Sequence, residues 1–385
     1  MKILILTPWC DDLCLQNVKG IPLNACLINK LLEREHKLEI FCVQGDIKLC
    51  HTLPLHKLNL PYISCPGPFV HFINIFLYFY HNFLLYNTLR KKVYNNKYDL
   101  ILNIAHLGTL AIKRLSVREK IPFVLLVFGI FDLRKPFLPA KLIPYFQYIS
   151  GFLLKPDKII TINDGSAPKD WLERTLKIPS DKIVEVANPR PLWSIEKKQG
   201  GKNIMIGYFS RFNYEKRTDL FIKIAYRILE KETDVNFIIA GSGALAKEIQ
   251  KLQAHFPGRV VYKGWLDYNQ MCELYKEIDI LISTARYANG VLPVIEAQSC
   301  GIPVVAFNIA DTKRFILDGK TGFLTSNLTV DEFVSKISIL MKNKELREKM
   351  GNSAKEFTLS TFPDTEEWAN FIVTELEKLD VDQKH

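Results

Sequence analysis

The chain has 385 residues, which is long for one domain and comfortable for two. A hydrophobic fraction of 48% and a charged fraction of 24% exclude a disordered chain and are typical of a folded globular protein. The apolar run that opens the sequence is too short for a secretory signal and predicts a buried strand. Eight cysteines without paired CxxC spacing predict free thiols in a reducing, cytoplasmic setting, rather than zinc sites or structural disulfides.

The net charge of +10 is confined to the first half of the chain. Residues 1–192 carry 25 Lys and Arg against 15 Asp and Glu, whereas residues 193–385 carry 26 of each kind. This basic half could face an anionic membrane leaflet, an anionic acceptor or nucleic acid, or it could serve solubility alone.

Short apolar, β-branched runs alternate with helical patterns along almost the whole chain. Such runs are typical of strands buried on both faces of a parallel sheet. Their alternation with helices predicts a doubly wound α/β fold. The expected strands are 3–7, 38–43, 100–104, 123–128, 158–162, 205–209, 236–240, 260–262, 280–283 and 303–307, and expected helices include 24–34, 219–230, 245–253, 268–276 and 330–341.

Residues 69–86 are rich in aromatic side chains and approach the length that a bilayer requires. Two histidines and two asparagines interrupt the segment, which argues against a transmembrane helix. A mostly buried helix is the first interpretation. A helix that presents aromatic side chains to a lipid surface, followed by the basic Arg90-Lys91-Lys92, is the second.

The alternation breaks once, at residues 188–203, where prolines, glycines and lysines without periodicity predict a linker. A new strand then starts a second sheet. We expect two Rossmann-like domains whose strands end at a common cleft, because ligands of such sheets bind at the carboxyl ends of the strands.

Two cations, five residues apart, follow the first strand of the second sheet. Arg211 offers a rigid fork of donors and Lys216 a mobile charge, a combination suited to a diphosphate. A solvated loop with surface cations is the alternative. Further along, Gly241-Ser-Gly243 is similar to the start of a dinucleotide-binding turn, although any tight turn into a helix uses the same glycines.

The stretch Asn289-Gly290-Val291-Leu292-Pro293 leads into a helix whose first position is expected at Pro293. The free backbone N–H groups of that helix would make an anion site. Glu296 could accept hydrogen bonds from the two hydroxyls of a ribose, or it could simply suit the helix dipole. Together with Arg211 and Lys216, the pattern predicts a site for a diphosphate and a ribose.

An ordered set of motifs spans roughly residues 200–330. It comprises Gly207-Tyr-Phe-Ser-Arg211 with Lys216, the Gly241–Gly243 turn, Val261-Tyr-Lys-Gly264-Trp, Glu296-Ala-Gln-Ser-Cys-Gly-Ile-Pro-Val-Val305 and Asp318-Gly-Lys-Thr-Gly-Phe-Leu324. This set resembles the nucleotide-sugar-binding domain of the retaining glycosyltransferase family 4, also described as glycosyl transferases group 1. The first half of the chain is similar to that family only in outline.

The resemblance implies a GT-B fold, in which two Rossmann-like domains have parallel sheets facing a central cleft. It implies an acceptor-binding domain at residues 1–190, a nucleotide-sugar-binding domain at 203–365, and a last helix at about 366–385 that crosses back onto the first domain. The implied catalytic set is Arg211, Lys216 and Glu296. The implied donor contacts are Gly20, Gly207, Arg211, Lys216, Gly241, Gly243, Asn289, Gly290, Val291, Leu292 and Glu296.

The sequence departs from the family pattern at three places, which involve four residues. Ala288 stands where the family's first glutamate contacts the donor sugar, Phe128 where a histidine lies near the reaction centre, and Ala310-Asp311 where two glycines occur. Donor identity therefore does not carry over. Besides Phe128, His106 could lie in the cleft, although a lone histidine beside an apolar strand is more often structural.

The expected function is a hexosyltransferase that moves a sugar from a nucleoside diphosphate to a glycan or lipid-linked acceptor, in cell-surface polysaccharide or glycolipid synthesis, with retention of configuration. We expect no cofactor, no metal and no nucleic acid; the one Asp-x-Asp, Asp380-Val-Asp382, lies in a charged tail. The basic half is expected to contact a membrane. The alternatives are a non-catalytic nucleotide-sugar-binding partner, a sugar-nucleotide epimerase and an NAD-dependent oxidoreductase.

Overall fold

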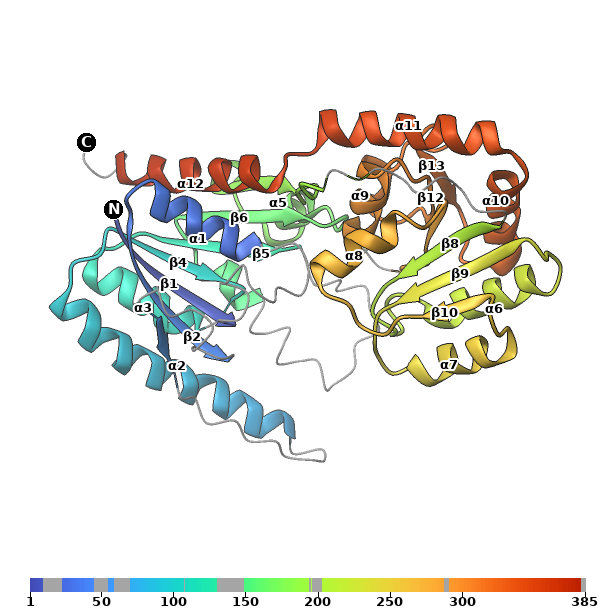
Figure 1. The fold of residues 1–385 in the computed structure, drawn as a ribbon. Coiled ribbons are helices and arrows are strands. Elements are labelled where there is room, and N and C mark those ends of the chain that lie inside the picture. Colours follow the sequence, from blue (N-terminus) through green and yellow to red (C-terminus); the bar gives the residue numbers. More distant parts are fainter. Residues whose placement is uncertain are drawn as a thin grey trace.

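Two parallel β-sheets, one in each half of the chain, form the framework of the protein (Figure 1). The computed structural model describes residues 1–9, 23–44, 55–58, 70–106, 108–129, 149–193, 195, 203–286 and 291–381. The strands of both sheets point their carboxyl ends toward the space between the two halves. Every strand pair among these residues is parallel, as the alternating pattern predicts.

The first sheet has the strand order β3-β2-β1-β4-β5-β6-β7. Its central strand β4 is buried on both faces, because Leu100 and Leu102 belong to one apolar cluster and Ile101 to another. The strands are β1 (Lys2–Trp9), β2 (Lys37–Gln44), β3 (Leu55–Lys57), β4 (Leu100–Ile104), β5 (Phe123–Phe128), β6 (Lys158–Asn163) and β7 (Ile183–Ala187), connected by helices that include α1 (Leu23–Glu33), α2 (Val70–Asn95), α3 (Thr109–Glu119) and α5 (Pro168–Leu176).

The second sheet has the order β10-β9-β8-β11-β12-β13, so its first strand in the chain, β8, lies inside the sheet. The loops after β8, β9 and β11 therefore meet at one edge, where they build the site described below. The strands are β8 (Ile204–Phe209), β9 (Val235–Ala240), β10 (Val260–Tyr262), β11 (Ile280–Ser283), β12 (Val304–Phe307) and β13 (Gly322–Thr325), and the helices include α6 (Thr218–Leu229), α7 (Ala246–His255), α8 (Tyr268–Tyr275), α9 (Val291–Ser299), α10 (Val330–Lys342) and α11 (Lys344–Thr361).

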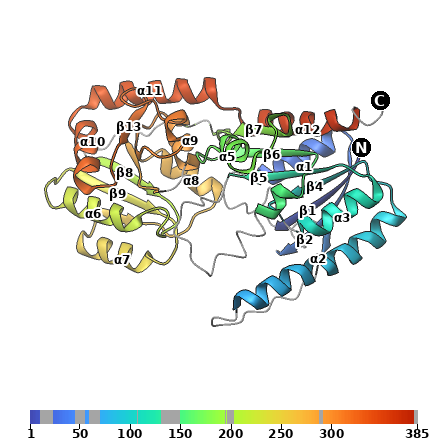
Figure 2. The same ribbon diagram turned by 180° about the vertical axis from the view of Figure 1, so that it is seen from behind.

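The last helix, α12 (Thr365–Val381), leaves the second half and packs against α1 of the first half (Figures 1 and 2). Trp368 and Ile372 of α12 are fully buried and belong to the same apolar cluster as Ile3 and Leu27. The end of the chain thus completes the core under the first sheet.

Helix α2 lies at the outer edge of the first half, beside α3 (Figures 1 and 2). Its Leu85, Tyr86 and Leu89 are buried in the cluster beneath it. Within the described ranges, no helix combines the length and the apolar character needed to cross a bilayer.

Candidate functional site

A cavity of about 340 Å³ opens at the carboxyl ends of the strands in the second sheet. The loops that follow β8, β9, β10 and β11, together with the first turns of α9, build its wall. The edge of the sheet at which such folds bind ligands is therefore hollow here. The lining residues are Tyr208, Phe209, Ser210, Arg211, Lys216, Ala240, Gly241, Ser242, Trp265, Leu266, Asp267, Tyr268, Met271, Ile282, Ser283, Thr284, Ala285, Leu292, Pro293 and Glu296.

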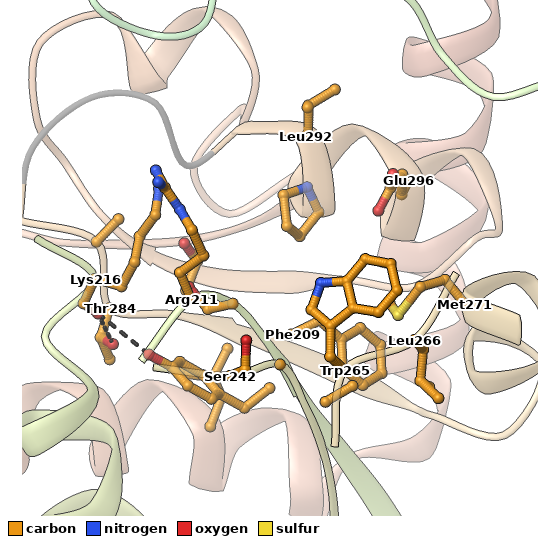
Figure 3. Close-up of a pocket in the computed structure, with 18 of the residues that line it drawn as sticks. Phe209, Arg211, Lys216, Ser242, Trp265, Leu266, Met271, Thr284, Leu292 and Glu296 are labelled. Atoms are coloured by element: carbon orange, nitrogen blue, oxygen red, sulfur yellow. Dashed lines mark hydrogen bonds between the residues drawn. The ribbon is translucent and has the colours of Figure 1, made fainter. Parts of the chain in front are cut away.

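Arg211 and Lys216 lie in the loop between β8 and α6, on one side of this cavity (Figure 3). The side-chain oxygen of Asn213 accepts a hydrogen bond from the Lys216 backbone N–H at 3.0 Å. The Thr284 hydroxyl donates to the Lys216 carbonyl oxygen at 2.7 Å. The backbone of Lys216 is thus held by the residue that follows β11 as well as by its own loop. Lys216 is buried and Arg211 is exposed, so the cavity has one cation of each kind.

Gly241 and Gly243 let the loop after β9 approach the loop after β8 very closely. Their φ angles are +138° and +147°, a region that side-chain-bearing residues rarely adopt. A Cβ on Gly241 would lie 1.8 Å from the Ser210 carbonyl oxygen, and one on Gly243 would lie 2.5 Å from that of Phe212. These glycines therefore serve the shape of the Arg211 loop. Gly241 lines the cavity, whereas Gly243 does not.

Glu296 lies on α9 at the opposite side of the cavity from the two cations (Figure 3). It is only 9% exposed, and its Oε2 accepts a hydrogen bond from the Tyr275 hydroxyl at 2.7 Å. Burial raises the pKa of Glu296 to about 7, although the bond from Tyr275 acts in the other direction. A buried carboxyl group that is half ionised near neutral pH can accept hydrogen bonds from a pair of ligand hydroxyls.

The sequence predicts Pro293 as the first residue of this helix. In the structure, α9 begins at Val291, so Pro293 is its third residue. The difference has a simple cause: the N–H groups of a first helical turn have no partner within the helix, so proline is tolerated anywhere in that turn. Leu292 and Pro293 line the cavity, whereas Val291 is buried and lies near Gly165 of the first half.

An apolar wall follows β10. Trp265, Leu266 and Met271 line the cavity there, and Trp265 keeps 48% of its surface exposed (Figure 3). An indole ring left half open at a strand exit offers a flat surface on which another ring can stack. The sequence motif Val261-Tyr-Lys-Gly264-Trp contains this residue, but its motif role alone did not predict that the ring is open to the cavity.

Several expected donor contacts lie elsewhere or cannot be placed. Gly207 lies within β8, where an added Cβ would come within 2.6 Å of Ile278. It therefore serves packing of the sheet and is not a cavity wall. Gly20, Asn289 and Gly290 lie outside the described residues, as does Ala288.

His106 follows β4 of the first sheet, and Phe128 ends β5 of the same sheet. The His106 ring packs edge-to-face on Phe152 with the centroids 4.7 Å apart, and burial lowers its pKa to about 3. The ring is thus neutral and forms part of the packing beneath the strand ends. Phe128, the last residue of β5, keeps 39% of its surface exposed at the carboxyl end of that strand.

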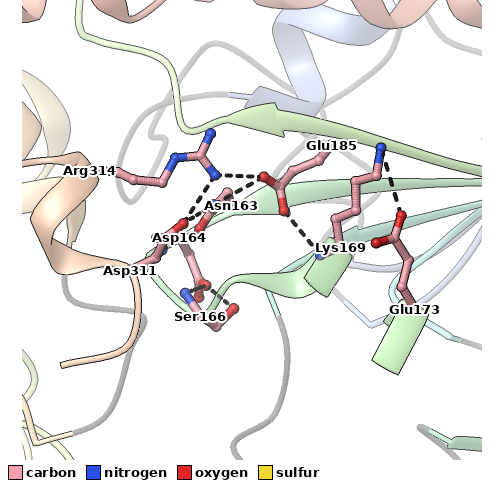
Figure 4. Close-up of polar contacts among 9 residues, drawn as sticks. Asn163, Asp164, Ser166, Lys169, Glu173, Glu185, Asp311 and Arg314 are labelled. Atoms are coloured by element: carbon pink, nitrogen blue, oxygen red, sulfur yellow. Dashed lines mark hydrogen bonds and ion pairs between the residues drawn. The ribbon is translucent and has the colours of Figure 1, made fainter. Parts of the chain in front are cut away.

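Polar contacts join the two halves where the family pattern would have glycines (Figure 4). The Asn163 amide at the end of β6 donates to Asp311 Oδ2 at 2.9 Å, and the Asp311 backbone N–H donates to the Gly165 carbonyl at 3.0 Å. Arg314 bridges Asp311 at 3.0 Å and Glu185 of β7 at 2.9 Å. The departure at Asp311 thus creates a bond between the halves.

Asp164 is a residue that sequence reasoning missed. Its carboxylate accepts hydrogen bonds from the Ser166 hydroxyl at 2.6 Å and from the Ser166 backbone N–H at 3.2 Å. Burial raises the pKa of Asp164, while the positive charge of Lys216 lowers it. A carboxyl group of the first half therefore lies within electrostatic reach of a cavity lysine, a proximity that no local sequence signal carries.

No three His, Cys, Asp or Glu side chains in the described part of the chain gather as a metal-binding group. Asp382 of the Asp-x-Asp pair lies outside that part.

Residues 190–357 match the family model described as glycosyl transferases group 1. This region contains every cavity residue named above. A stretch of 172 residues is 32% identical to poly(ribitol-phosphate) alpha-N-acetylglucosaminyltransferase of Staphylococcus aureus (strain COL), covering 43% of this chain and 34% of that protein. The chain spans between 30% and 49% of the length of the first curated relatives that it matches.

Solved structures match the whole fold. Sucrose-phosphate synthase from Thermosynechococcus elongatus superimposes with a TM-score of 0.78 at 14% identity, covering 99% of this chain and 100% of that one. Anabaena HepE in complex with UDP and glucose gives a TM-score of 0.69 at 17% identity, covering 98% and 99%. The fold is GT-B, as the resemblance implies.

Proposed function

We propose that the protein is a glycosyltransferase that uses a nucleoside diphosphate sugar as donor. One observation carries the proposal: a single cavity has Arg211 and Lys216 on one side and the buried Glu296 on the other. The cations suit a diphosphate, and the carboxyl group suits the two hydroxyls of a ribose. The match of this region to glycosyl transferases group 1 supports the same assignment.

Within the cavity, the base would stack near Trp265, and the first turn of α9 would add backbone N–H groups to the diphosphate. We propose Asn289, Gly290, Val291, Leu292 and Gly20 as further donor contacts. UDP is the first nucleotide to test, because the HepE structure that shares the fold holds UDP.

In the proposed reaction, negative charge grows on the diphosphate as the bond to the sugar breaks. Arg211 and Lys216 would stabilise that charge, and preorganised donors of this kind can each contribute about 3–4 kcal/mol in the transition state. We propose that residues 1–190, with the helix at 366–385, bind the acceptor and that residues 203–365 bind the donor. We further propose that transfer retains the configuration of the sugar and that the acceptor is a glycan or is linked to a lipid. The enzyme would act in cell-surface polysaccharide or glycolipid synthesis, with its basic first half in contact with a membrane.

A nucleotide-sugar-binding protein without transfer activity is the second candidate. Phe128 favours it, because this half-exposed apolar ring cannot exchange a proton or accept a hydrogen bond at the end of β5. This candidate predicts that donors bind without being consumed.

Nucleotide release from UDP-, GDP- and ADP-linked sugars tests the proposal, first with water and then with a membrane lipid extract as acceptor. We expect release from one donor class, and a decrease in kcat of about 100-fold or more for Arg211→Ala and for Lys216→Ala. Lys223→Ala, an exposed lysine on α6, is the matched control and should leave kcat unchanged. Binding without release would favour the second candidate. Binding of NAD(H) with no response to any nucleoside diphosphate would contradict both.

A further inference from the structure

Helix α2 has two faces of unusual character. Its inner face is buried, with Leu85 and Leu89 in the core beneath it. Its outer face carries four aromatic side chains at spacings of three or four residues, which places them on one side of the helix. Phe76, Phe79, Tyr80 and Phe83 are 69%, 51%, 39% and 57% exposed. The rings of Phe76 and Tyr80 stack with centroids 6.1 Å apart. The four aromatic side chains thus form an apolar strip along the helix, in which these two rings are in contact.

A contiguous strip of this kind marks a binding surface, because single exposed apolar residues are common but clusters of them are not. The same face continues two and three turns beyond Phe83, at Arg90, Lys91 and Tyr94, all of which are exposed. The 26 residues of α2 include no Asp or Glu. The outer face of α2 is thus aromatic at one end and cationic at the other.

The neighbouring helix α3 adds positive charge beside this face. The Arg114 guanidinium lies 4.5 Å from the centre of the Tyr86 ring of α2, and Arg118 donates to the Tyr86 hydroxyl at 3.3 Å. Glu119 forms an ion pair with Arg118 at 3.1 Å and offsets its charge. The net positive charge beside this face therefore comes from Arg90, Lys91 and Arg114. Residues 1–192 as a whole have ten more basic than acidic residues, whereas the other half is balanced.

We infer that the outer face of α2 docks the protein on an anionic lipid surface. Aromatic side chains partition into the interface between headgroups and acyl chains, and Arg and Lys beside them bind the anionic headgroups. An anionic lipid surface complements this face in charge, whereas the α2 helix of a second copy would offer its cations no Asp or Glu.

The inference assigns a specific surface to the membrane contact that the proposed function includes. It can fail while sugar transfer succeeds, because the donor cavity is lined by residues of the second half alone. In Figure 1, α2 lies away from the second half, which holds the cavity.

Co-sedimentation of the full chain with vesicles tests the inference. Vesicles of phosphatidylcholine with one third phosphatidylglycerol are compared with pure phosphatidylcholine, at low and at physiological salt. We expect binding to the anionic vesicles that weakens with salt. We expect at least a tenfold decrease in partitioning for the double variant Phe79→Ser/Phe83→Ser, and loss of the preference for anionic lipid in Arg90→Glu/Lys91→Glu.

Phe371→Ser on α12 is the matched control, because Phe371 is an aromatic residue with 41% exposure on a different helix, and it should bind like the wild type. UDP binding and the thermal melting temperature show whether each variant is folded. Three results would overturn the inference: no binding of the wild type to anionic vesicles, an equal loss in Phe371→Ser, or a wild-type dimer in sedimentation velocity that Phe79→Ser/Phe83→Ser dissociates without any effect on vesicle binding.

Discussion

Glu296 combines a structural cost with a proposed binding role. Its carboxyl group is buried beside Tyr275, Trp193 packs on the same tyrosine with ring centroids 5.5 Å apart, and Phe209 meets that ring edge-on at 5.1 Å. Burial of an acid in such apolar surroundings disfavours its charged form. Hydrogen bonds donated by ligand hydroxyls would therefore stabilise the ionised form of the Glu296 carboxyl group.

This cost predicts how stability depends on pH. The pKa of Glu296 is raised from an ordinary 4.5 to about 7, so the folded protein holds this proton more tightly than the unfolded chain does. Stability should therefore fall as the pH rises from about 4.5 through 7. In urea denaturation at pH 8, Glu296→Gln should be more stable than the wild type by about 1–3 kcal/mol, and at pH 4.5 the difference should vanish.

The matched control is Glu348→Gln on α11, whose side chain is 62% exposed and pairs with Lys344 at 3.7 Å. Its pH dependence should follow that of the wild type. If Glu296→Gln shows the wild-type slope between pH 4.5 and 8, the carboxyl group is not held in its neutral form by burial.

The sequence predicts the bounds of a strand well where that strand is apolar on both faces. The expected strands at 100–104, 123–128, 260–262 and 280–283 agree with the structure to the residue. Three strands were missed, namely β3, β7 and β13. Strand β7 is only half buried and carries Glu185 toward Arg314, so its pattern lacks the continuous apolar run. Strand β13 overlaps Asp318-Gly-Lys-Thr-Gly-Phe-Leu324, which is rich in turn formers.

The site was predictable only in part, for a physical reason. Arg211 and Lys216 lie in the loop after β8, and Glu296 lies on the helix that follows β11; the topology of a parallel sheet brings such positions together. Tyr275 and Asp164 reach the site through packing between elements that are distant in the chain, and no local pattern encodes such contacts. Trp265 lies at a strand exit within a sequence motif, but the exposure of its ring to the cavity depends on that same packing.

Helix α12 offers a prediction at the scale of elements. Trp368 is fully buried in the core of the first half, whereas Phe371 of the same helix is 41% exposed. Trp368→Ala should destabilise the first half by about 3–5 kcal/mol, because it leaves a large cavity in that core. Hydrogen exchange should show faster exchange in β1 and α1.

Phe371→Ala, made in the same helix, should cost less than about 0.5 kcal/mol. Equal effects of the two variants, or faster exchange confined to the second half, would show that α12 does not complete the first core.

At the scale of the whole molecule, the contacts of Asp311 and Arg314 hold the two halves in one arrangement. The donor cavity itself belongs to the second half, so breaking these contacts should separate binding from transfer. Asp311→Ala removes the bonds from Asn163 and Arg314. We expect its nucleotide Kd to stay within twofold of the wild type, while kcat for transfer falls about tenfold because the halves are misplaced.

Asp331→Ala is the control, since Asp331 pairs with Arg227 at 3.1 Å on the exposed surface of the second half alone. It should change neither quantity. A loss of nucleotide affinity in Asp311→Ala, or an unchanged kcat, would contradict a role for this contact in placing the halves.

The central claim is that one cavity holds a diphosphate at Arg211 and Lys216 and a ribose at Glu296. Titration calorimetry with UDP and with 2′,3′-dideoxy-UDP, on the wild type and on Glu296→Ala, tests it most directly. We predict that the wild type prefers UDP by about tenfold, equivalent to about 1.4 kcal/mol, and that Glu296→Ala binds both ligands equally. Lys216→Ala should weaken both alike. If Glu296→Ala retained the preference for UDP, the ribose would lie elsewhere and the assignment of the cavity would be wrong.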